Sequence, residues 1–335
     1  MTLRKFLHIT VMLLLCCAVR TSAQSRCHSM PFVLMEYNCE NLFDCRHDSL
    51  KEDLSFLPEG KHRWTFSRYW RKVNDIAKVI HQCGGTYANR HIPDVVAMTE
   101  VENDSVMYML AHGSMLREAG YRFVITNSPD IRGVDVALLY NPLTFRLLNH
   151  YPLRMTPMKG QRPTRDILYV EGTVRSKDTI HIFVVHAPSR GEGAYASEPY
   201  RMAVARRLEE AADSVRAIHA DANIIMAGDF NDYHYNKSLK LLGKAGMTNV
   251  SAKARGRIAT GTYKYGGRWM SLDHILLSAP LLDKVRECRI HDPSWLLQVD
   301  KAGGMKPRRT FLGTFYNGGV SDHLPLLVRM EFEYR

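Results

Sequence analysis

The chain has few cysteines and lacks the motifs of several large enzyme classes. Seven cysteines occur among 335 residues, without a Cys-x-x-Cys pair and without a His/Cys cluster at the spacing of zinc ligands. There is also no Gly-x-Ser-x-Gly elbow, no His-Glu-x-x-His pair and no P-loop. The sequence therefore does not indicate a disulfide scaffold, a structural zinc site or catalysis through those three motifs. Five cysteines follow residue 23, and this odd number predicts at least one free thiol.

Long apolar runs are also scarce, and the one that stands out is at the N-terminus. Two basic residues precede an apolar segment at residues 9–19, and small residues at 21–23 offer a cleavage point. This is the layout of a secretory signal peptide, and the run is short for a membrane span. We expect residues 1–23 to be removed and the protein to be secreted or periplasmic, without integral membrane association. A lipoprotein is the less favoured alternative, because leucines rather than a small residue precede Cys16 and Cys17.

The rest of the chain is basic and contains no linker rich in proline, glycine or serine. Residues 1–23 carry three basic and no acidic side chains, so their removal lowers the formal charge from +11 to +8. A basic protein is attracted to polyanions such as nucleic acid or anionic lipid, but a solvated surface rich in lysine and arginine has the same charge. The absence of a linker predicts a single domain over residues 24–335.

Short apolar or β-branched runs predict strands along the whole chain. They occupy residues 32–37, 94–98, 122–126, 134–140, 168–174, 180–185, 223–227, 273–277 and 324–332. Helices are predicted at residues 69–82 and 198–219, the second with an apolar stripe in steps of four and three and with Ser197 as its N-cap. Strands often follow one another without a helix, which favours an α/β fold with mixed sheets packed face to face and helices outside. Two polar stretches, residues 45–65 and 292–319, are predicted to be surface loops that can overhang a groove.

Chemically versatile side chains stand at the ends of six predicted strands. Four groups follow their strands, at residues 38–41, 99–103, 186–190 and 228–232, and two lie at the start of theirs, at 271–273 and 321–323. If the last two strands run antiparallel to the others, all six groups meet at one sheet edge, where ligands of α/β folds often bind. Carboxylate and amide oxygens in these groups are hard ligands that suit Mg²⁺ or Mn²⁺, and the histidines can handle protons.

Five of these segments, in this order, resemble the signature of the endonuclease/exonuclease/phosphatase superfamily. They are YNCENLF at 37–43, TEV at 99–101, GDFND at 228–232, SLDHIL at 271–276 and SDHLP at 321–325. That superfamily includes pancreatic-type deoxyribonucleases, abasic-site endonucleases, neutral sphingomyelinases and inositol polyphosphate 5-phosphatases. The resemblance spans residues 32–332 and implies a four-layer α/β/β/α sandwich of two mixed, largely antiparallel sheets with outer helices.

The resemblance implies a set of metal ligands. Glu100 is similar to the principal metal-binding glutamate of the family, and Asn38 and Glu40 are similar to its supporting ligands. Asp322 is similar to a residue that either pairs with His323 or binds a second metal ion. The implied cofactor is Mg²⁺ or Mn²⁺.

The resemblance also implies catalytic roles. Asp229 is similar to the aspartate that orients or deprotonates the attacking water, and Asn231 to the asparagine that steadies phosphate or metal. His323 is similar to the histidine that contacts the scissile phosphate. His186 is similar to the second catalytic histidine, with Asp273 as the aspartate that holds it.

Several arginines have two interpretations at the level of sequence. Arg132, Arg165 and Arg190 are candidates for binding the substrate phosphate, although surface arginines in loops have the same pattern. Arg201 is interpreted as a charge on the exposed face of its helix, and His274 as a structural residue.

The implied function is hydrolysis of phosphodiester bonds by a divalent-metal-dependent phosphoesterase, with a secreted nuclease acting on DNA or RNA as the favoured interpretation. Four basic residues between 301 and 309 are candidates for the floor of a nucleic-acid groove. The alternative is a phosphatase or a sphingomyelinase-like phosphodiesterase, for which residues 295–297 are a candidate apolar membrane contact. A non-catalytic binding module is the third and remotest interpretation. No obligate protein partner is predicted.

Overall fold

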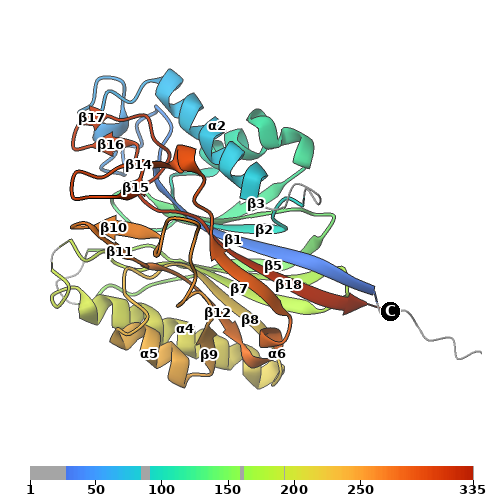
Figure 1. Cartoon of the computed structure of the whole chain (residues 1–335). Coiled ribbons are helices and arrows are strands. Elements are labelled where there is room, and N and C mark those ends of the chain that lie inside the picture. Colours follow the sequence, from blue (N-terminus) through green and yellow to red (C-terminus); the bar gives the residue numbers. More distant parts are fainter. Residues whose placement is uncertain (1–27, 84–90, 159–161, 192, 335) are drawn as a thin grey trace, which may run out of the picture.

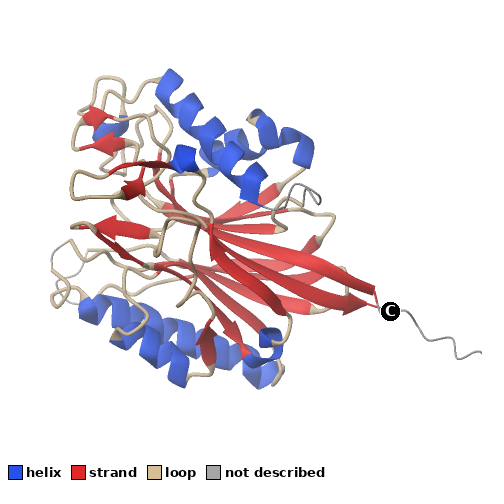
Figure 2. Cartoon of the chain, in the orientation of Figure 1, coloured by secondary structure: helices blue, strands red, loops and turns tan. Residues whose placement is uncertain are grey.

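The computed structural model describes residues 28–83, 91–158, 162–191 and 193–334. Two six-stranded mixed sheets pack face to face, and helices cover the outer face of each sheet (Figure 1, Figure 2). The predicted α/β/β/α sandwich is therefore confirmed. The predicted leader, residues 1–23, lies outside the described residues, and its removal stays a prediction.

The first sheet contains the first and the last strand of the described chain. Its order is β13 (Val285–Ile290), β18 (Leu326–Tyr334), β1 (His28–Leu42), β2 (Val95–Val101), β4 (Asp135–Tyr140) and β3 (Arg122–Ile125). Strand β1 is parallel to β2, and the other neighbouring pairs are antiparallel.

The second sheet has a similar arrangement. Its order is β5 (Phe145–Leu153), β6 (Ile167–Val174), β7 (Thr179–His186), β8 (Asn223–Asp229), β12 (Asp273–Ser278) and β9 (Met247–Asn249). Strand β7 is parallel to β8, and the other neighbouring pairs are antiparallel. Because β12 runs against β8 and β18 runs against β1, the groups that follow strands and those that begin strands meet at the same end of the sandwich, as predicted.

Helices form the two outer layers. On the side of the first sheet lie α2 (Phe66–Cys83), α3 (Asp104–Tyr108), the π-helical turn η2 (Met109–Gly113) and the 3₁₀ turns η1 (Leu54–Phe56), η3 (Met115–Ala119) and η4 (Ser294–Leu296). On the side of the second sheet lie α4 (Glu198–Ile218), α5 (Lys237–Lys244) and α6 (Ala279–Leu282). One apolar cluster fills the space between the sheets and extends under α2, and a second lies between the second sheet and α4 and α5.

The central strands are buried on both faces, which explains their continuous apolar sequences. Every residue of β4 and β12 is buried, and β8 is exposed only in part at its first residue. Strand β5 escaped prediction because it is an edge strand whose middle residues are exposed, so its apolar alternation is weak. The apolar residues that identified the strands are thus those that fill the core.

Helix α4 differs from its prediction at both ends. Ile218, predicted to belong to the apolar stripe, is 77% exposed, so the stripe ends before the last turn. Ser197 does not cap the helix, because its hydroxyl donates to the carbonyl oxygen of Gly193 (2.7 Å) and accepts from Arg201 (2.6 Å). The sequence located the helix, but the partners of its first turn were decided by neighbouring segments.

Residues 292–319 are more ordered than the predicted surface loop. They contain η4 and two short hairpins, β14 (Leu297–Val299) with β15 (Met305–Pro307), and β16 (Phe311–Leu312) with β17 (Phe315–Tyr316). Together with the hairpin of β10 (Tyr263–Tyr265) and β11 (Arg268–Met270), they gather at one end of the sandwich, on the left in Figure 1.

None of the helices in the described part of the chain is long and apolar enough to cross a bilayer. Cys39, Cys45, Cys83 and Cys288 are free, in agreement with the expectation of at least one free thiol. Burial raises the pKa of the Cys39 and Cys83 thiols, which keeps them neutral and unreactive.

Position 228 requires a glycine, because β7 and β8 approach each other closely just before the end of the sheet that carries the polar side chains. Its φ of 148° disfavours any L side chain, and an added Cβ would lie 1.9 Å from the carbonyl oxygen of Val185. The backbone of β8 can therefore pair with β7 and still carry Asp229 to the sheet end only because residue 228 has no side chain.

We predict that Gly228→Ala lowers the free energy of unfolding by about 3 kcal/mol, because both the strained φ and the contact with Val185 must be accommodated. Gly243→Ala is the matched control, since Gly243 lies in α5 with no neighbouring atom within 4 Å of its added Cβ. Urea denaturation checks both, and the control should change stability by no more than about 1 kcal/mol, in the stabilising direction. Equal effects of the two substitutions would contradict the assigned role of Gly228.

Candidate active site

The backbone is strained where the strands end, and this strain turns polar side chains toward the sheet edge. The pairing of β1 with β2 shifts register between Asn38 and Leu42, and that of β2 with β4 shifts on either side of Glu100. Glu40, Asn41, Glu100 and Asn231 have φ values of 47°, 56°, 58° and 49°. Left-handed φ values are uncommon outside glycine, and bulges redirect side chains. Their coincidence with the sequence-predicted residues marks this end as a functional site.

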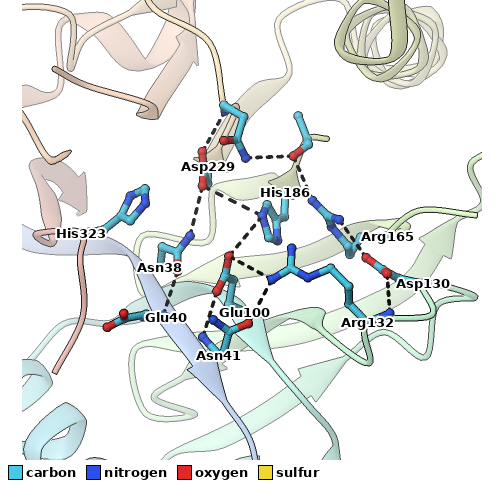
Figure 3. Close-up of polar contacts among 12 residues, drawn as sticks. Asn38, Glu40, Asn41, Glu100, Asp130, Arg132, Arg165, His186, Asp229 and His323 are labelled. Atoms are coloured by element: carbon cyan, nitrogen blue, oxygen red, sulfur yellow. Dashed lines mark hydrogen bonds and ion pairs between the residues drawn. The ribbon is translucent and has the colours of Figure 1, made fainter. Parts of the chain in front are cut away.

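An acidic centre lies between the two sheets at this end (Figure 3). Asn38 donates from Nδ2 to Asp229 Oδ2 (3.1 Å), and its Oδ1 accepts from the backbone N–H of Glu40 (2.9 Å). Glu100 Oε2 accepts from the backbone N–H of Asn41 (2.9 Å). Residues 38, 100 and 229 come from β1, β2 and β8, so both sheets build this centre.

His186 faces the acidic centre as a neutral ring. Its Nε2 lies 3.7 Å from Glu100 Oε1 and 4.0 Å from Asp229 Oδ2. Burial, and then the positive charges of Arg165 and Arg132, hold the pKa of His186 well below its ordinary value. Its Nδ1 is buried and has no hydrogen-bond partner among the described residues. The predicted pairing of His186 with Asp273 is therefore wrong.

Asp273 instead holds His323. Its Oδ2 lies 2.7 Å from His323 Nδ1 and also accepts from the hydroxyl of Thr262. Burial lowers the pKa of His323, but the carboxylate of Asp273, with Asp229 and Asp322, raises it well above the ordinary value. The prediction failed because Asp273 begins β12 and is paired across the sheet with Asp229, where the chain before β18 brings His323 rather than His186 within reach.

Asp229 connects these groups. Its Oδ1 accepts from the backbone N–H of Asn231 (2.8 Å), and burial, followed by the charge of Asp273, raises its pKa to about 7. Ligand atoms of Asp229, Asp273 and His323 lie within 4.8 Å of one another. Clustered buried carboxylates repel each other when ionised, and a divalent cation relieves that repulsion. Asp229 and the nearby Glu100 supply oxygen ligands that fit Mg²⁺ or Mn²⁺, whereas Asp273 Oδ2 is already bonded to His323 and Thr262.

The predicted metal ligands Glu40 and Asp322 share a different partner. Arg309 donates from Nε to Glu40 Oε1 (3.1 Å) and from Nη2 to Asp322 Oδ2 (2.9 Å). Asp322 is thus paired with Arg309 in the structure, not with His323 as one of its two predicted roles required. The other oxygen of Glu40 accepts from the backbone N–H of Thr310 (2.6 Å).

The three predicted substrate-binding arginines lie in different environments. Arg132 is 42% exposed, donates to Asn41 Oδ1 (3.0 Å) and lies 3.7 Å from Glu100, so its guanidinium borders the acidic centre. Arg165 is buried and donates to Asp130 (2.8 Å) and to the carbonyl oxygen of Ala187 (3.0 Å). These bonds favour a role for Arg165 in supporting the chain after β7.

Arg190 lies near Asp232, which is the centre of a second group of polar contacts. It is 3.3 Å from Asp232, which also forms an ion pair with Arg201 (Nε to Oδ1, 2.8 Å) and accepts a hydrogen bond from Ser238 Oγ (2.7 Å). Arg201 is buried, so its interpretation as an exposed charge on the helix face is wrong. Asp232 therefore joins α4 and α5 to the segment that carries Asp229 and Asn231. His274 is structural, as predicted, since it is buried and its Nε2 lies 2.9 Å from the carbonyl oxygen of Asp232.

Some residues of the site escaped sequence reasoning. Asp232 gave a signal, because it directly follows the GDFN segment, but nothing linked it to Arg201 thirty-one residues earlier. Thr262 gave none, and Arg309 was predicted only as part of the basic stretch at 301–309, because both reach the site by contacts between segments distant in sequence. Glu102, which belongs to the polar group at 99–103, accepts a hydrogen bond from the backbone N–H of Asp44 (2.7 Å) and so holds the loop after β1.

Some residues of both proposed substrate surfaces are used in internal contacts. Lys306 and Arg308 of the basic stretch make internal contacts, with Asp300 (3.3 Å) and with the carbonyl oxygen of Asn317 (3.5 Å). Leu296 and Leu297 of the apolar candidate are buried, and they do not form an exposed membrane contact. Both findings arise because these side chains make contacts within the 292–319 segment or lie in the core beneath it.

The two-sheet fold with acidic residues and two histidines at one end defines the class of protein as a phosphoesterase. A family model described as the endonuclease/exonuclease/phosphatase family matches residues 33–332, and the chain belongs to this family. Members of the family are hydrolases that act on phosphate esters. No curated protein is significantly similar to the chain in sequence.

Solved structures share this fold. An endonuclease/exonuclease/phosphatase family protein from Bacteroides thetaiotaomicron is 16% identical with a TM-score of 0.60, over 91% of this chain and 99% of that one. A mannosyl-6-phosphatase from the same organism is 16% identical with a TM-score of 0.59, over 89% and 98% of the two chains. Truncated TDP2 from Caenorhabditis elegans is 16% identical with a TM-score of 0.56, over 90% and 97%.

We predict that Asp273→Asn lowers the pKa of His323, because the neutral amide no longer stabilises the imidazolium. In the metal-free protein, the wild-type ring keeps its proton as pH rises past the ordinary histidine range, whereas the variant ring loses it earlier. Proton NMR titration of the histidine signals in EDTA measures this. Asp213→Asn, on the exposed face of α4, is the control and should leave the titration of His323 unchanged. An unshifted curve in Asp273→Asn would contradict the assigned pairing.

Proposed function

We propose that the protein is a divalent-metal-dependent phosphoesterase that hydrolyses its substrate by in-line attack of water on phosphorus. The observation that carries the proposal is the meeting of Glu100, Asp229, His186 and the Asp273–His323 pair at one end of the sandwich. A binding module has no need for two histidines whose pKa values are shifted in opposite directions beside buried carboxylates. This arrangement therefore favours catalysis over the non-catalytic alternative.

Glu100, with Asn38 and Asp229 beside it, would hold the cation. A bound Mg²⁺ or Mn²⁺ supplies positive charge against the nonbridging oxygens of the phosphate. Arg132 lies at the exposed border of this centre and adds a second cationic group for the same oxygens. Negative charge on the nonbridging oxygens is then neutralised from more than one direction.

The two histidines and Asp229 differ in how readily each holds a proton, and this difference allows proton transfer during the reaction. His323 keeps its proton because of Asp273 and can donate to an oxygen of the phosphate. Burial and the charge of Asp273 raise the pKa of Asp229 to about 7 in the absence of a metal ion, and the carboxylate can orient a water molecule and accept its proton. Asn231 donates from Nδ2 to the carbonyl oxygen of Ala187 (3.0 Å), which ties the segment carrying Asp229 to the end of β7.

The substrate class is proposed from weaker observations. The basic charge of the chain supports the secreted nuclease interpretation. The alternative, a phosphatase or phosphodiesterase for small phosphate esters, is supported by the internal pairing of the basic residues in 292–319, which leaves less free charge for a polyanion. A mannosyl-6-phosphatase among the structures of the same fold is compatible with this alternative. We also propose export, on the basis of residues 1–23.

We predict that Glu100→Gln and His323→Ala each lower kcat on the order of 100- to 1,000-fold, because the first removes a carboxylate that holds the cation and the second removes a proton donor to the phosphate. Circular dichroism should show an unchanged fold. Glu118→Gln, an exposed carboxylate outside the site, is the control and should retain full turnover. Near-normal turnover in either site variant would refute the assignment.

We expect residues 24–335 to hydrolyse at least one phosphate ester in Mg²⁺ or Mn²⁺ and to lose this activity in EDTA. The substrates to compare are plasmid DNA, RNA, sphingomyelin, bis-p-nitrophenyl phosphate and p-nitrophenyl phosphate. Nicking of plasmid supports the nuclease interpretation, whereas activity confined to the monoester supports a phosphatase. Activity that survives EDTA would contradict metal dependence.

A further inference from the structure

The carboxylates of Glu40 and Asp322 are held by one guanidinium. Arg309 donates from two different nitrogens, Nε to Glu40 (3.1 Å) and Nη2 to Asp322 (2.9 Å). The Glu40 side chain is 7% exposed and that of Asp322 is 20% exposed, so both charges are largely withdrawn from solvent. Two carboxylates in this situation need a compensating cation, and a guanidinium with donors in a planar fork can serve both.

Arg309 is presented by a segment that is fixed from several sides. Its own carbonyl oxygen accepts from Asn317 Nδ2 (2.8 Å), and the hydroxyl of Thr310 donates to the carbonyl oxygen of Val320 (3.2 Å). The buried ammonium of Lys72 donates to the Thr310 hydroxyl (2.7 Å) and also to the backbone carbonyl oxygen of Glu40. Helix α2, residues 309–310 and the bulge at Glu40 are therefore one connected unit, which fixes the backbone that carries Arg309; its side chain is 41% exposed.

The orientation of Glu40 separates it from the acidic centre. In Figure 3 its carboxylate points away from that of Glu100, toward the side where His323 lies. Both of its oxygens already accept hydrogen bonds, one from Arg309 and one from Thr310. Glu100, by contrast, has one oxygen that faces only His186 and Arg132, each at 3.7 Å, among the described residues.

We propose that Arg309 is a built-in cation that occupies the Glu40–Asp322 pair, so that this pair is not a metal site in the native protein. The divalent ion of the reaction is then held on the side of Glu100, Asn38 and Asp229. This inference rests on the proposed metal-dependent function and deepens it. The positive charge that neutralises Asp322, next to His323 in the chain, comes from the side chain of Arg309, which cannot dissociate as a metal ion can.

Mn²⁺ binding tests the proposal directly. Removing the guanidinium leaves two facing carboxylates, which are suitable oxygen ligands for a divalent ion. At pH 8, Arg309→Met is expected to bind one more Mn²⁺ per chain than the wild type, counted by equilibrium dialysis and electron paramagnetic resonance. The double variant Arg309→Met, Asp322→Asn should lose the added site. Arg308→Met is the matched control, since Arg308 contacts a backbone carbonyl oxygen and no carboxylate, and it should bind as the wild type does.

Thermal unfolding gives an independent readout. Arg309→Met should melt below the wild type in EDTA and should gain more than the wild type when Mn²⁺ is added, because the ion replaces the lost charge. An unchanged Mn²⁺ count in the folded variant would overturn the proposal.

A second substitution decides the matter if Arg309→Met does not fold. Glu40→Gln in the otherwise native chain should leave the number of bound Mn²⁺ ions unchanged, and the loss of one ion would overturn the proposal. Failure of the wild type to bind any Mn²⁺ would instead count against the proposed metal-dependent function, so the two failures are distinguishable.

Discussion

The structure depends on how the negative charges of several buried carboxylates are neutralised or hydrogen-bonded at one end of the two packed sheets. Glu100, Asp229, Asp273, Glu40 and Asp322 all approach this end, and each would be costly to ionise there without a partner. The partners differ in kind. Asp273 is met by His323 and Thr262, Glu40 and Asp322 by Arg309, and Asp229 by an amide and a backbone N–H. In the acidic centre, the guanidinium of Arg132 lies 3.7 Å from Glu100, farther than Arg309 lies from Glu40 and Asp322.

This division of charge also explains the two histidines. Both lie near Asp229, at the end of β7 in one case and just before β18 in the other, yet their pKa values move in opposite directions. His186 is buried near Arg165 and Arg132, which disfavour its protonation, whereas His323 is bonded to Asp273, which favours it. One chain thus places a neutral and a charged imidazole at the same sheet end, and such separation of pKa values is what general acid–base chemistry needs.

Much of the scaffold around the site is used to hold these few residues. The parallel pairs β1–β2 and β7–β8 bring four strand ends to one edge, and Gly228 allows the second pair to approach closely. Asp232 fastens α4 and α5 to the segment after β8 through Arg201 and Ser238. The 292–319 segment contributes Arg309, and several of its other side chains, among them Lys306 and Leu296, make contacts within the segment or lie in the core.

The sequence was sufficient for the fold class, for nine of the twelve strands of the two six-stranded sheets and for most of the residues that meet at the sheet end. Buried strands have continuous apolar runs, and these runs can be read directly; β5, an exposed edge strand, has a weak pattern and was missed. The polar groups at strand ends named Asn38, Glu100, His186, Asp229 and His323, because a chemical site at a sheet edge requires such residues just beyond core strands.

What the sequence by itself determined is therefore which residues belong to the core and which chemistry is available. Only the tertiary structure decided the pairing: Asp273 with His323 rather than His186, Arg201 with Asp232, and Arg309 between Glu40 and Asp322. The physical reason is range. Burial and local propensity are properties of a residue and its close neighbours along the chain, and they leave a periodic trace. A hydrogen bond between residues up to 269 positions apart depends on where two strand ends and a loop meet in space, and it leaves no such trace.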